Sequence, residues 1–319
     1  MNIVILDGYT SNPGDLSWEG FNKFGQVTVY DRTSDSLVIE RIKNAEIIFI
    51  NKISITKEIM SNSPKLKYIG VLATGYNMVD IEGANQYGIT VTNVPSYSTS
   101  SVAQYVFALL LDICHKVELH SESVHKGEWS KSLDFCYWKT PQIELSGKTI
   151  GIIGYGKIGK KTTEIALAFG MKVLIYNRSK VNEVETNFKK FVSLESLYKM
   201  SDIISLHVPL FDSTKNIINN DSIKLMKKGV ILINTSRGGL IDDKAIVENL
   251  ENGKIKAAAI DVVKEEPISK DSILLRAPNL IITPHIAWAP LEARERLMKI
   301  AVKNLETFIN GNAINVVNN

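Results

Sequence analysis

The chain has 319 residues, enough for two domains, and its 45% apolar and 22% charged residues are typical of a globular protein. A net charge of only +3, without a dense Lys/Arg run, argues against a nucleic-acid partner. The two cysteines, Cys114 and Cys136, lack a metal or redox spacing, and the N-terminus MNIVILDG reaches Asp7 too soon for a signal peptide. No apolar run approaches the roughly 18 residues of a membrane helix. We therefore expect a soluble cytoplasmic α/β protein without a membrane partner.

Short apolar runs that mostly alternate with helical patterns predict parallel strands covered on both faces. In the first third of the chain these runs are 3–6, 27–30, 47–50, 68–72 and 89–92. After Leu145 they are 149–153, 173–176, 203–207, 230–234, 257–262 and 280–283. The pattern predicts two α/β units, of about five and about six strands.

Two longer helical segments separate or follow these units. Ser101-Val-Ala-Gln104 has the form of a capping box and predicts a helix to about Val117. Pro290 precedes a second helix, 291–310, which Gly311 ends. Whether this last helix closes the second unit or crosses back to the first stays open at this point. The stretch 126–144 is irregular and rich in aromatic residues.

A glycine-rich turn lies between a predicted strand, 149–153, and a predicted helix, 160–169. It reads Gly154-Tyr-Gly156-Lys-Ile-Gly159, the GxGxxG pattern of dinucleotide-binding βαβ units. Gly154 permits the tight turn, Gly156 lets the backbone approach a pyrophosphate, and Gly159 allows close packing of helix and strand. The free N–H groups at the helix N-terminus favour phosphate. A glycine turn without a ligand is the less favoured alternative.

The turn Asn177-Arg178-Ser179-Lys180 follows the next predicted strand, where such proteins usually have an acidic residue for the ribose. Asn177 removes a charge that would repel a 2′-phosphate, and Arg178 can pair with one. Ser179 and Lys180 can add donors. We therefore favour NADP(H) as cofactor, with NAD(H) possible if the turn is only a solvated basic surface.

Three later segments each place polar residues at or just past the end of a predicted strand: Arg237, then Asp261 and Glu266, then His285. Ligands of parallel sheets bind outside the carboxyl ends of the strands, so these side chains are expected to converge. Each alone has an ordinary structural explanation, as an ion pair, a turn residue or a core histidine. Together they supply an anion binder, a carboxylate and a proton donor, which a 2-keto acid reductase requires.

Seven segments together resemble the D-isomer-specific 2-hydroxyacid dehydrogenase family along essentially the whole chain. They are GYGKIG (154–159), HVPL (207–210), NTSRGG (234–239), AAAIDVVKEEP (257–267), TPHIAW (283–288), ATGYNMVD (73–80) and VPSYSTSSVAQ (94–104). ATGYN and DFCYW (134–138) are most similar to the glycerate dehydrogenase/hydroxypyruvate reductase branch.

The resemblance implies two Rossmann-like doubly wound domains. A flavodoxin-like substrate domain would comprise 1–98 plus 289–319, so that the C-terminal helix crosses back, and an NAD(P)-binding Rossmann domain would comprise 99–288. Family members are commonly homodimers joined through arms beside the crossover helix.

The resemblance also implies residue roles for the reduction of a small 2-keto acid, of hydroxypyruvate or glyoxylate type, to the D-2-hydroxy acid. Arg237 would bind the substrate carboxylate and carbonyl, His285 would be the acid/base, and Glu266 would pair with His285 and favour its charged form. The other expected substrate contacts are Leu72, Ala73, Thr74, Gly75 and, from a second subunit, Trp138. The expected cofactor contacts are Gly154, Tyr155, Gly156, Lys157, Ile158, Gly159, Asn177, Arg178, Ser179, His207, Val208, Pro209, Thr214, Thr235, Ser236 and Asp261.

Two other functions stay open. Some proteins of this fold are NAD(H)-sensing transcriptional corepressors with the same polar triad, although the lack of long disordered tails favours an enzyme. A short 3-phosphoglycerate dehydrogenase is the second alternative, and the end of the chain at Asn319 leaves no room for an added regulatory domain. A metal site at His115, His120 and His125 is not expected, because a spacing of five does not place side chains on one helix face.

Overall fold

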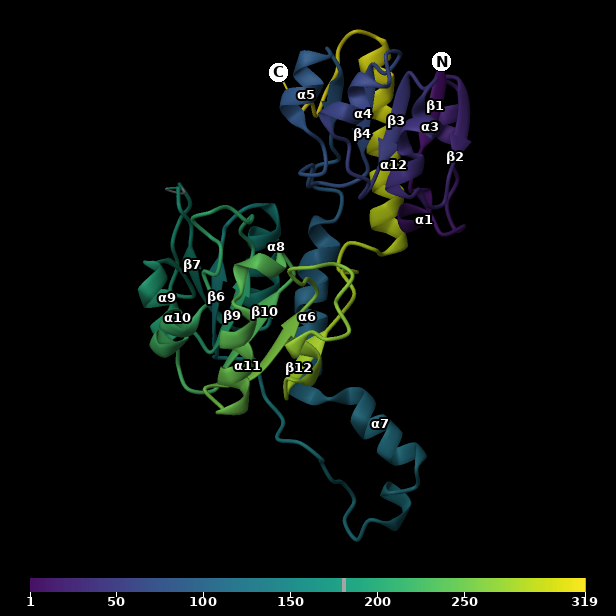
Figure 1. Cartoon of the computed structure of the whole chain (residues 1–319). Helices are drawn as coiled ribbons and strands as arrows, with labels where there is room; N and C mark the ends of the chain where they lie inside the picture. Colours follow the sequence, from purple (N-terminus) through teal and green to yellow (C-terminus); the bar gives the residue numbers. More distant parts are fainter. Residues whose placement is uncertain (180–181, 319) are drawn as a thin grey trace. The chain divides into compact units, whose positions relative to one another are not determined.

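The computed structural model describes residues 1–179 and 182–318, which form two compact units. Unit 1 comprises Met1–Ser98 and Trp288–Asn319, and unit 2 comprises Thr99–Ala287. The sequence predicted the second boundary one residue later. Figure 1 labels the elements of each unit along the chain.

Unit 1 is built on a parallel five-stranded sheet in the order β2-β1-β3-β4-β5, which is the flavodoxin-like order. The strands are β1 (Asn2–Ile5), β2 (Gln26–Val29), β3 (Ile47–Ile50), β4 (Tyr68–Val71) and β5 (Thr90–Thr92). Its short helices are α1 (Gly8–Ser11), α2 (Glu19–Asn22), η1 (Asp35–Leu37), α3 (Val38–Ile42), α4 (Lys57–Ser61) and α5 (Ile81–Gln86). Strands β3 and β4 are buried throughout, because helices cover both faces.

The C-terminal helix α12 (Leu291–Ile309) packs in unit 1, which settles the question that strand counting left open. It buries Ala293, Leu297 and Ala301 at a spacing of four, so one helical stripe meets the sheet. Arg294 donates two hydrogen bonds of 2.6 Å to the carboxylate of Asp15. These bonds join the C-terminal helix to the loop that follows α1.

Unit 2 is built on a parallel seven-stranded sheet in the order β12-β11-β10-β9-β6-β7-β8. The strands are β6 (Thr149–Ile153), β7 (Lys172–Tyr176), β8 (Lys189–Phe191), β9 (Ile203–Leu206), β10 (Val230–Asn234), β11 (Ile255–Ile260) and β12 (Leu280–Ile282). The sequence predicted six of them. It missed β8, an edge strand of three residues with two lysines and thus without an apolar signal.

Helices cover both faces of this second sheet. One face packs against α6 (Thr99–His115) and α8 (Lys157–Ala168), and the other against α9 (Leu194–Met200), α10 (Asn220–Leu225), α11 (Asp243–Glu251) and the short η4 (Ile273–Arg276). Another short helix, η3, spans Gly238–Leu240. Helix α6 begins two residues before Ser101, so the predicted capping box lies in the first turn and does not start the helix. Across the residues that the structure describes, no helix is long and apolar enough to cross a membrane.

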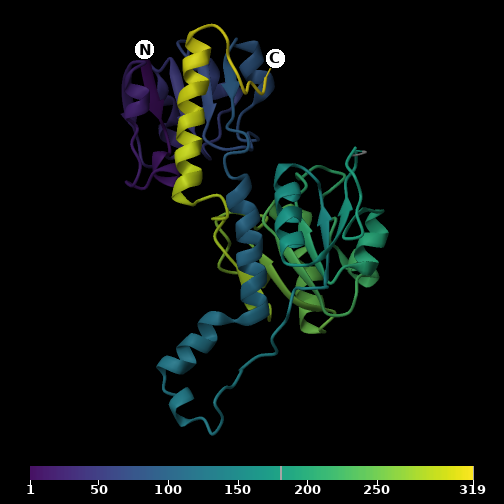
Figure 2. The same ribbon diagram turned by 180° about the vertical axis from the view of Figure 1, so that it is seen from behind.

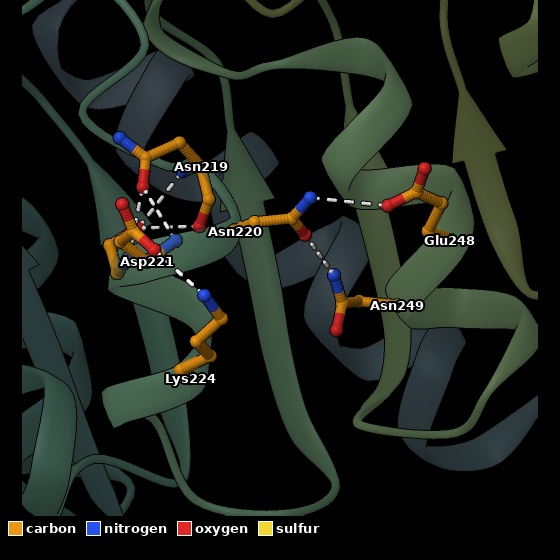
Figure 3. Close-up of polar contacts among 7 residues, drawn as sticks. Asn219, Asn220, Asp221, Lys224, Glu248 and Asn249 are labelled. Carbon is orange, nitrogen blue, oxygen red and sulfur yellow. Dashed lines mark hydrogen bonds and ion pairs between the residues drawn. The ribbon is translucent and has the colours of Figure 1, made fainter.

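Polar side chains tie α10 to α11 on the outer surface of unit 2 (Figure 3). Asn219 closes a capping box at the start of α10. The neighbouring Asn220 donates to Glu248 at 3.1 Å and accepts from Asn249 at 2.8 Å. These contacts fix two neighbouring helices on the same face of the sheet.

Residues 116–144 form an arm that extends away from the sheet of unit 2 (Figure 2). It contains α7 (Val117–His125) and the short helix η2 (Trp129–Lys131), followed by an extended return. His120 of α7 holds the extended segment that follows η2. Its Nδ1 contacts the Lys116 carbonyl at 2.8 Å, and its Nε2 accepts the Lys139 N–H at 3.0 Å.

Gly159 in α8 leaves no room for a side chain. A Cβ atom at this position would lie 2.1 Å from the carbonyl oxygen of Gly154, whereas a Cβ at Gly156 would meet no atom within 4 Å. Gly159→Ala should therefore lower the free energy of unfolding by about 1–3 kcal/mol, as overpacking does. Gly156→Ala is the matched control and should lose less than about 1 kcal/mol. Urea denaturation followed by circular dichroism measures both, and equal losses would contradict the close approach.

Candidate active site

Five strand ends of unit 2 carry the predicted site residues. Gly154 follows β6, Asn177 follows β7, His207 follows β9, Thr235 follows β10 and Asp261 follows β11. The order of the sheet reverses between β6 and β9, since β7 and β8 lie to one side and β10 to β12 to the other. Such a reversal opens a crevice at the carboxyl ends of the strands. The glycine loop lies at this point.

The glycine loop has the geometry that a pyrophosphate requires. Gly154 has φ +99°, and a Cβ there would lie 2.6 Å from the His207 carbonyl oxygen, so only glycine fits. Gly156 is the N-cap of α8, and among the described residues no side chain caps this helix. A Cβ at Gly156 would point into open space, which a phosphate can fill. Lys157 and Ile158 form the first turn, where N–H groups and the helix dipole favour an anion.

The turn after β7 is braced against the glycine loop. Asn177 Oδ1 accepts the N–H of Tyr155 at 3.0 Å, and its Nδ2 donates to the carbonyl of Ser179 at 2.9 Å. Arg178 is exposed and its guanidinium lies 6.0 Å from the ring centre of Phe211. Within the described residues Arg178 forms no ion pair, so its charge is available to a ligand. Lys180, the remaining predicted residue of this turn, lies outside the described residues.

Two buried polar atoms on the neighbouring strand ends have no partner within the described part of the chain. They are Nδ1 of His207 and Oγ1 of Thr235. Buried polar atoms are nearly always paired in folded proteins, so a bound group with donors and acceptors is the natural partner for these two. Both belong to the predicted cofactor residues, and the glycine loop beside them can take phosphate, so the side chains present fit a dinucleotide.

Two other predicted cofactor residues near these strand ends, Thr214 and Ser236, bind backbone carbonyl groups and so support the turns. Thr214 Oγ1 donates to the carbonyl of Pro209 at 2.7 Å, which closes the loop that begins with His207 and Val208. Ser236 Oγ donates to the carbonyl of Leu206 at 2.7 Å and so joins the ends of β9 and β10.

Burial distinguishes the two histidines of the predicted site. It lowers the pKa of His207 to about 3, so that ring is neutral at physiological pH and unsuited to act as an imidazolium acid. His285 instead contacts a carboxylate, because its Nδ1 lies 2.7 Å from Oε2 of Glu266. The structure thus brings together two of the three residues predicted to be catalytic, with both side chains partly open to solvent.

A single buried carboxylate holds the turn that carries His285. Asp261, only 1% exposed, accepts the hydroxyl of Thr283 at 2.7 Å and the N–H groups of Ile286 and Ala287 at 2.9 and 2.8 Å. It therefore grips the chain on both sides of His285. His285 has φ +56°, a left-handed conformation that is uncommon outside glycine and needs such support.

Arg237 lies in the turn after β10, which packs against the segment leading to Glu266. Asn234, at the strand end, accepts the N–H of Ser236 and donates to the carbonyl of Arg237. A Cβ at Gly238 would lie 2.0 Å from the backbone of Val263, so the two turns touch through their main chains. The guanidinium is exposed and donates to the carbonyl of Ser236 at 2.7 Å.

The predicted substrate contacts of unit 1 lie after β4. Leu72 donates its N–H to Ile50 and accepts from Asn51, Ala73 accepts the N–H of Val94, and Thr74 Oγ1 donates to the carbonyl of Val94. This loop ends at Gly75 and belongs to unit 1, whereas the residues above belong to unit 2. Trp138 lies on the arm and is 68% exposed. Their participation in one substrate site stays a prediction.

Sequence reasoning missed the residues that support the site without facing it. Asn234 and Thr283 were named only as members of longer motifs, without a role of their own, and Glu183 was not considered. Asn234 ends a strand before a turn, and a buried amide there is a signal that could have indicated a brace. Nothing in the sequence indicates the long-range bond from Thr283 to Asp261 or the contacts of Glu183.

Comparison with known proteins agrees with this geometry. Residues 107–287 match the family described as "D-isomer specific 2-hydroxyacid dehydrogenase, NAD binding domain". A hydroxypyruvate reductase of Blautia hydrogenotrophica is 51% identical over 100% of both chains. A glycerate dehydrogenase of Methylorubrum extorquens is 42% identical over 99% of this chain and 98% of its own.

A solved structure shares the whole architecture. An acyclic imino acid reductase (Bsp5) in complex with NADPH and D-Arg superposes with a TM-score of 0.86 and 34% identity, over 99% of this chain and 100% of that one. The chain therefore belongs to the D-isomer-specific 2-hydroxyacid dehydrogenases, oxidoreductases that use a nicotinamide dinucleotide to interconvert small 2-keto acids and D-2-hydroxy acids.

Proposed function

We propose that this enzyme reduces hydroxypyruvate and glyoxylate to the corresponding 2-hydroxy acids in the cytoplasm, with Arg237, Glu266 and His285 as its catalytic residues. The observation that carries the proposal is the 2.7 Å contact between His285 and Glu266. A histidine paired with a carboxylate is suited to give a proton to a developing alkoxide. The names of the two relatives support the choice of keto acid.

Each residue has a distinct task in this proposal. A reduced nicotinamide bound at the glycine loop would supply the hydride for the carbonyl carbon. His285 donates a proton to the carbonyl oxygen, and Glu266 stabilises the imidazolium before that transfer. Arg237 binds the carboxylate of the substrate and stabilises negative charge on the carbonyl oxygen. The N–H groups of the loop after β4, from Ala73 to Gly75, would hold the substrate carboxylate. Asp261, which holds the His285 turn, would also hold the nicotinamide carboxamide.

A panel of 2-keto acids, each tested with NADPH and NADH, is the direct test. We expect turnover of hydroxypyruvate and glyoxylate. Cofactor binding without turnover would indicate a sensor related to the NAD(H)-binding corepressors. Preference for 3-phosphohydroxypyruvate would indicate a short 3-phosphoglycerate dehydrogenase.

His285→Ala should lower kcat by about 10²- to 10⁴-fold, the usual contribution of a general acid. The dissociation constant of the reduced cofactor, measured by fluorescence titration, should stay nearly unchanged, because the glycine loop is intact. His115→Ala removes an exposed imidazole that contacts Gln142, and it serves as the control. Near-normal turnover of His285→Ala would show that another group is the acid.

We propose a preference for NADPH on the basis of the turn after β7. Asn177 uses its amide within the protein, since Oδ1 holds Tyr155 and Nδ2 holds Ser179. It brings no negative charge, and the exposed guanidinium of Arg178 next to it can form charge-assisted bonds with a 2′-phosphate. The NADPH bound to the imino acid reductase is consistent with this choice, but it is a property of that protein.

Arg178→Ala should weaken NADPH binding by about 10-fold or more, because hydrogen bonds to charged groups contribute about 1.5–3 kcal/mol. NADH binding should change little. Lys172→Ala removes an exposed cation from the opposite end of β7 and controls for net charge. Equal losses for both cofactors in Arg178→Ala would mean that the turn does not select between them.

We also propose that the arm joins two copies of the chain. Its extended segment exposes large apolar side chains in a short stretch, with Leu133 103%, Phe135 89% and Trp138 68% exposed. Within the described residues these side chains are therefore not part of a hydrophobic core. A second copy would present the same apolar surface, which a symmetric interface requires. In such a dimer Trp138 would be the residue offered to the partner's site.

Phe135→Asp should convert a dimer into a monomer, because it places a charge at the centre of this surface. Light scattering coupled to size-exclusion chromatography measures the mass. Ile273→Asp changes an exposed apolar residue on η4, outside the arm, and should leave the mass unchanged. A monomeric wild-type chain would refute the proposed homodimer.

A further inference from the structure

We propose that the side chain of Tyr155, acting through Glu183, positions the adenosine half of the dinucleotide. The inference rests on the proposed role of the glycine loop in cofactor binding. It assigns Tyr155 and Glu183 as positioning residues, and neither needs to touch the cofactor with its side chain.

Tyr155 is bonded to the connection between β7 and β8 at two separate points. Its backbone N–H donates to Asn177 Oδ1 at 3.0 Å, and its hydroxyl donates to Glu183 Oε2 at 2.8 Å. The ring is buried, only 7% exposed, and meets Phe191 of β8 edge-on with a centroid distance of 5.3 Å. The dinucleotide motif leaves the identity of this position open, so the motif does not explain a buried tyrosine there.

Glu183 is the charged centre of this connection. Lys160 of α8 contacts Oε1 at 2.6 Å, and Lys189 of β8 contacts Oε2 at 3.2 Å. The hydrogen bond from Lys160, followed by that from Tyr155, lowers the pKa of Glu183 to about 2. The carboxylate is therefore ionised at neutral pH. It accepts two charge-assisted bonds from lysines and one bond from the tyrosine hydroxyl.

These bonds link the two parts of the protein that would hold the adenosine half. The glycine loop and the first turn of α8 would receive the pyrophosphate, and Arg178 and Ser179 lie on the connection between Asn177 and Glu183. Tyr155 and Lys160 come from the first part, and Glu183 from the second. In this proposal the bonds at Asn177 and Glu183 set the spacing between the pyrophosphate and ribose sites before a ligand arrives, which would reduce the cost of ordering on binding.

The nicotinamide half should be insensitive to this clamp. His285 follows β12, at the opposite edge of the sheet from β7 and β8. Loss of the clamp is therefore expected to change cofactor affinity and leave the chemical step of the saturated enzyme intact. This separation between affinity and turnover distinguishes positioning from a general loss of structure.

Tyr155→Phe removes the hydroxyl and keeps the buried ring. Isothermal titration calorimetry would measure binding of 2′,5′-ADP and of ADP-ribose, two fragments that contain the adenosine half, whichever binds the wild-type chain more tightly. We expect the dissociation constant to rise about 3- to 10-fold, in the range of one typical net hydrogen bond. The value of kcat at saturating cofactor and the melting temperature should stay close to those of the wild type.

Glu183→Gln tests the same clamp from its other end and should also weaken fragment binding, even if Tyr155→Phe fails to fold. Glu195→Gln is the matched control, since it removes an exposed carboxylate that pairs with Lys199 on α9 of the same unit. Unchanged fragment affinity in a folded Tyr155→Phe or Glu183→Gln chain would overturn the inference, as would an equal loss in Glu195→Gln or a loss confined to kcat. A wild-type chain that binds no dinucleotide would instead overturn the proposed function.

Discussion

Parallel pairing of the seven strands in unit 2 is the constraint on which the site depends. The central strands β6, β9 and β10 are buried along most of their length and mainly apolar, so most polar residues of the site lie where the strands end. Because all strands run the same way, Gly154, Asn177, His207, Asp261 and His285 reach the same edge of the sheet. The reversal of strand order beside β6 is where such folds bind their ligands, and it is where we propose that these residues act.

Around this edge buried or half-buried polar side chains hold backbone turns, and other side chains are left to face a ligand. Asp261 holds the turn of His285, Asn234 holds the turn of Arg237, and Asn177 holds the glycine loop. Hydrogen bonds of this kind, inside a poorly solvated region, are costly to break. The exposed part of the site consequently includes side-chain ends such as the guanidinium of Arg178.

Much of this architecture follows from local sequence. Continuous apolar runs indicated eleven of the twelve strands, and the spacing of Gly154, Gly156 and Gly159 identified the turn where a Cβ would collide or would point into open space. What escaped prediction depends on long-range contacts. Strand β8 begins with two lysines and has no apolar run that marks it as a strand. The bonds of Asp261 and Glu183 join residues that are far apart in the sequence. Ser101 was misassigned because its motif is also compatible with the first turn of a helix.

The hydrogen bond between His285 and Glu266 has a consequence for the direction of the proposed reaction. The contact engages Nδ1, which would leave Nε2 as the ring nitrogen that faces a substrate. In the proposed mechanism this one nitrogen would give a proton to a keto acid and take one from a hydroxy acid. One contact would therefore serve reduction and oxidation without a change of tautomer.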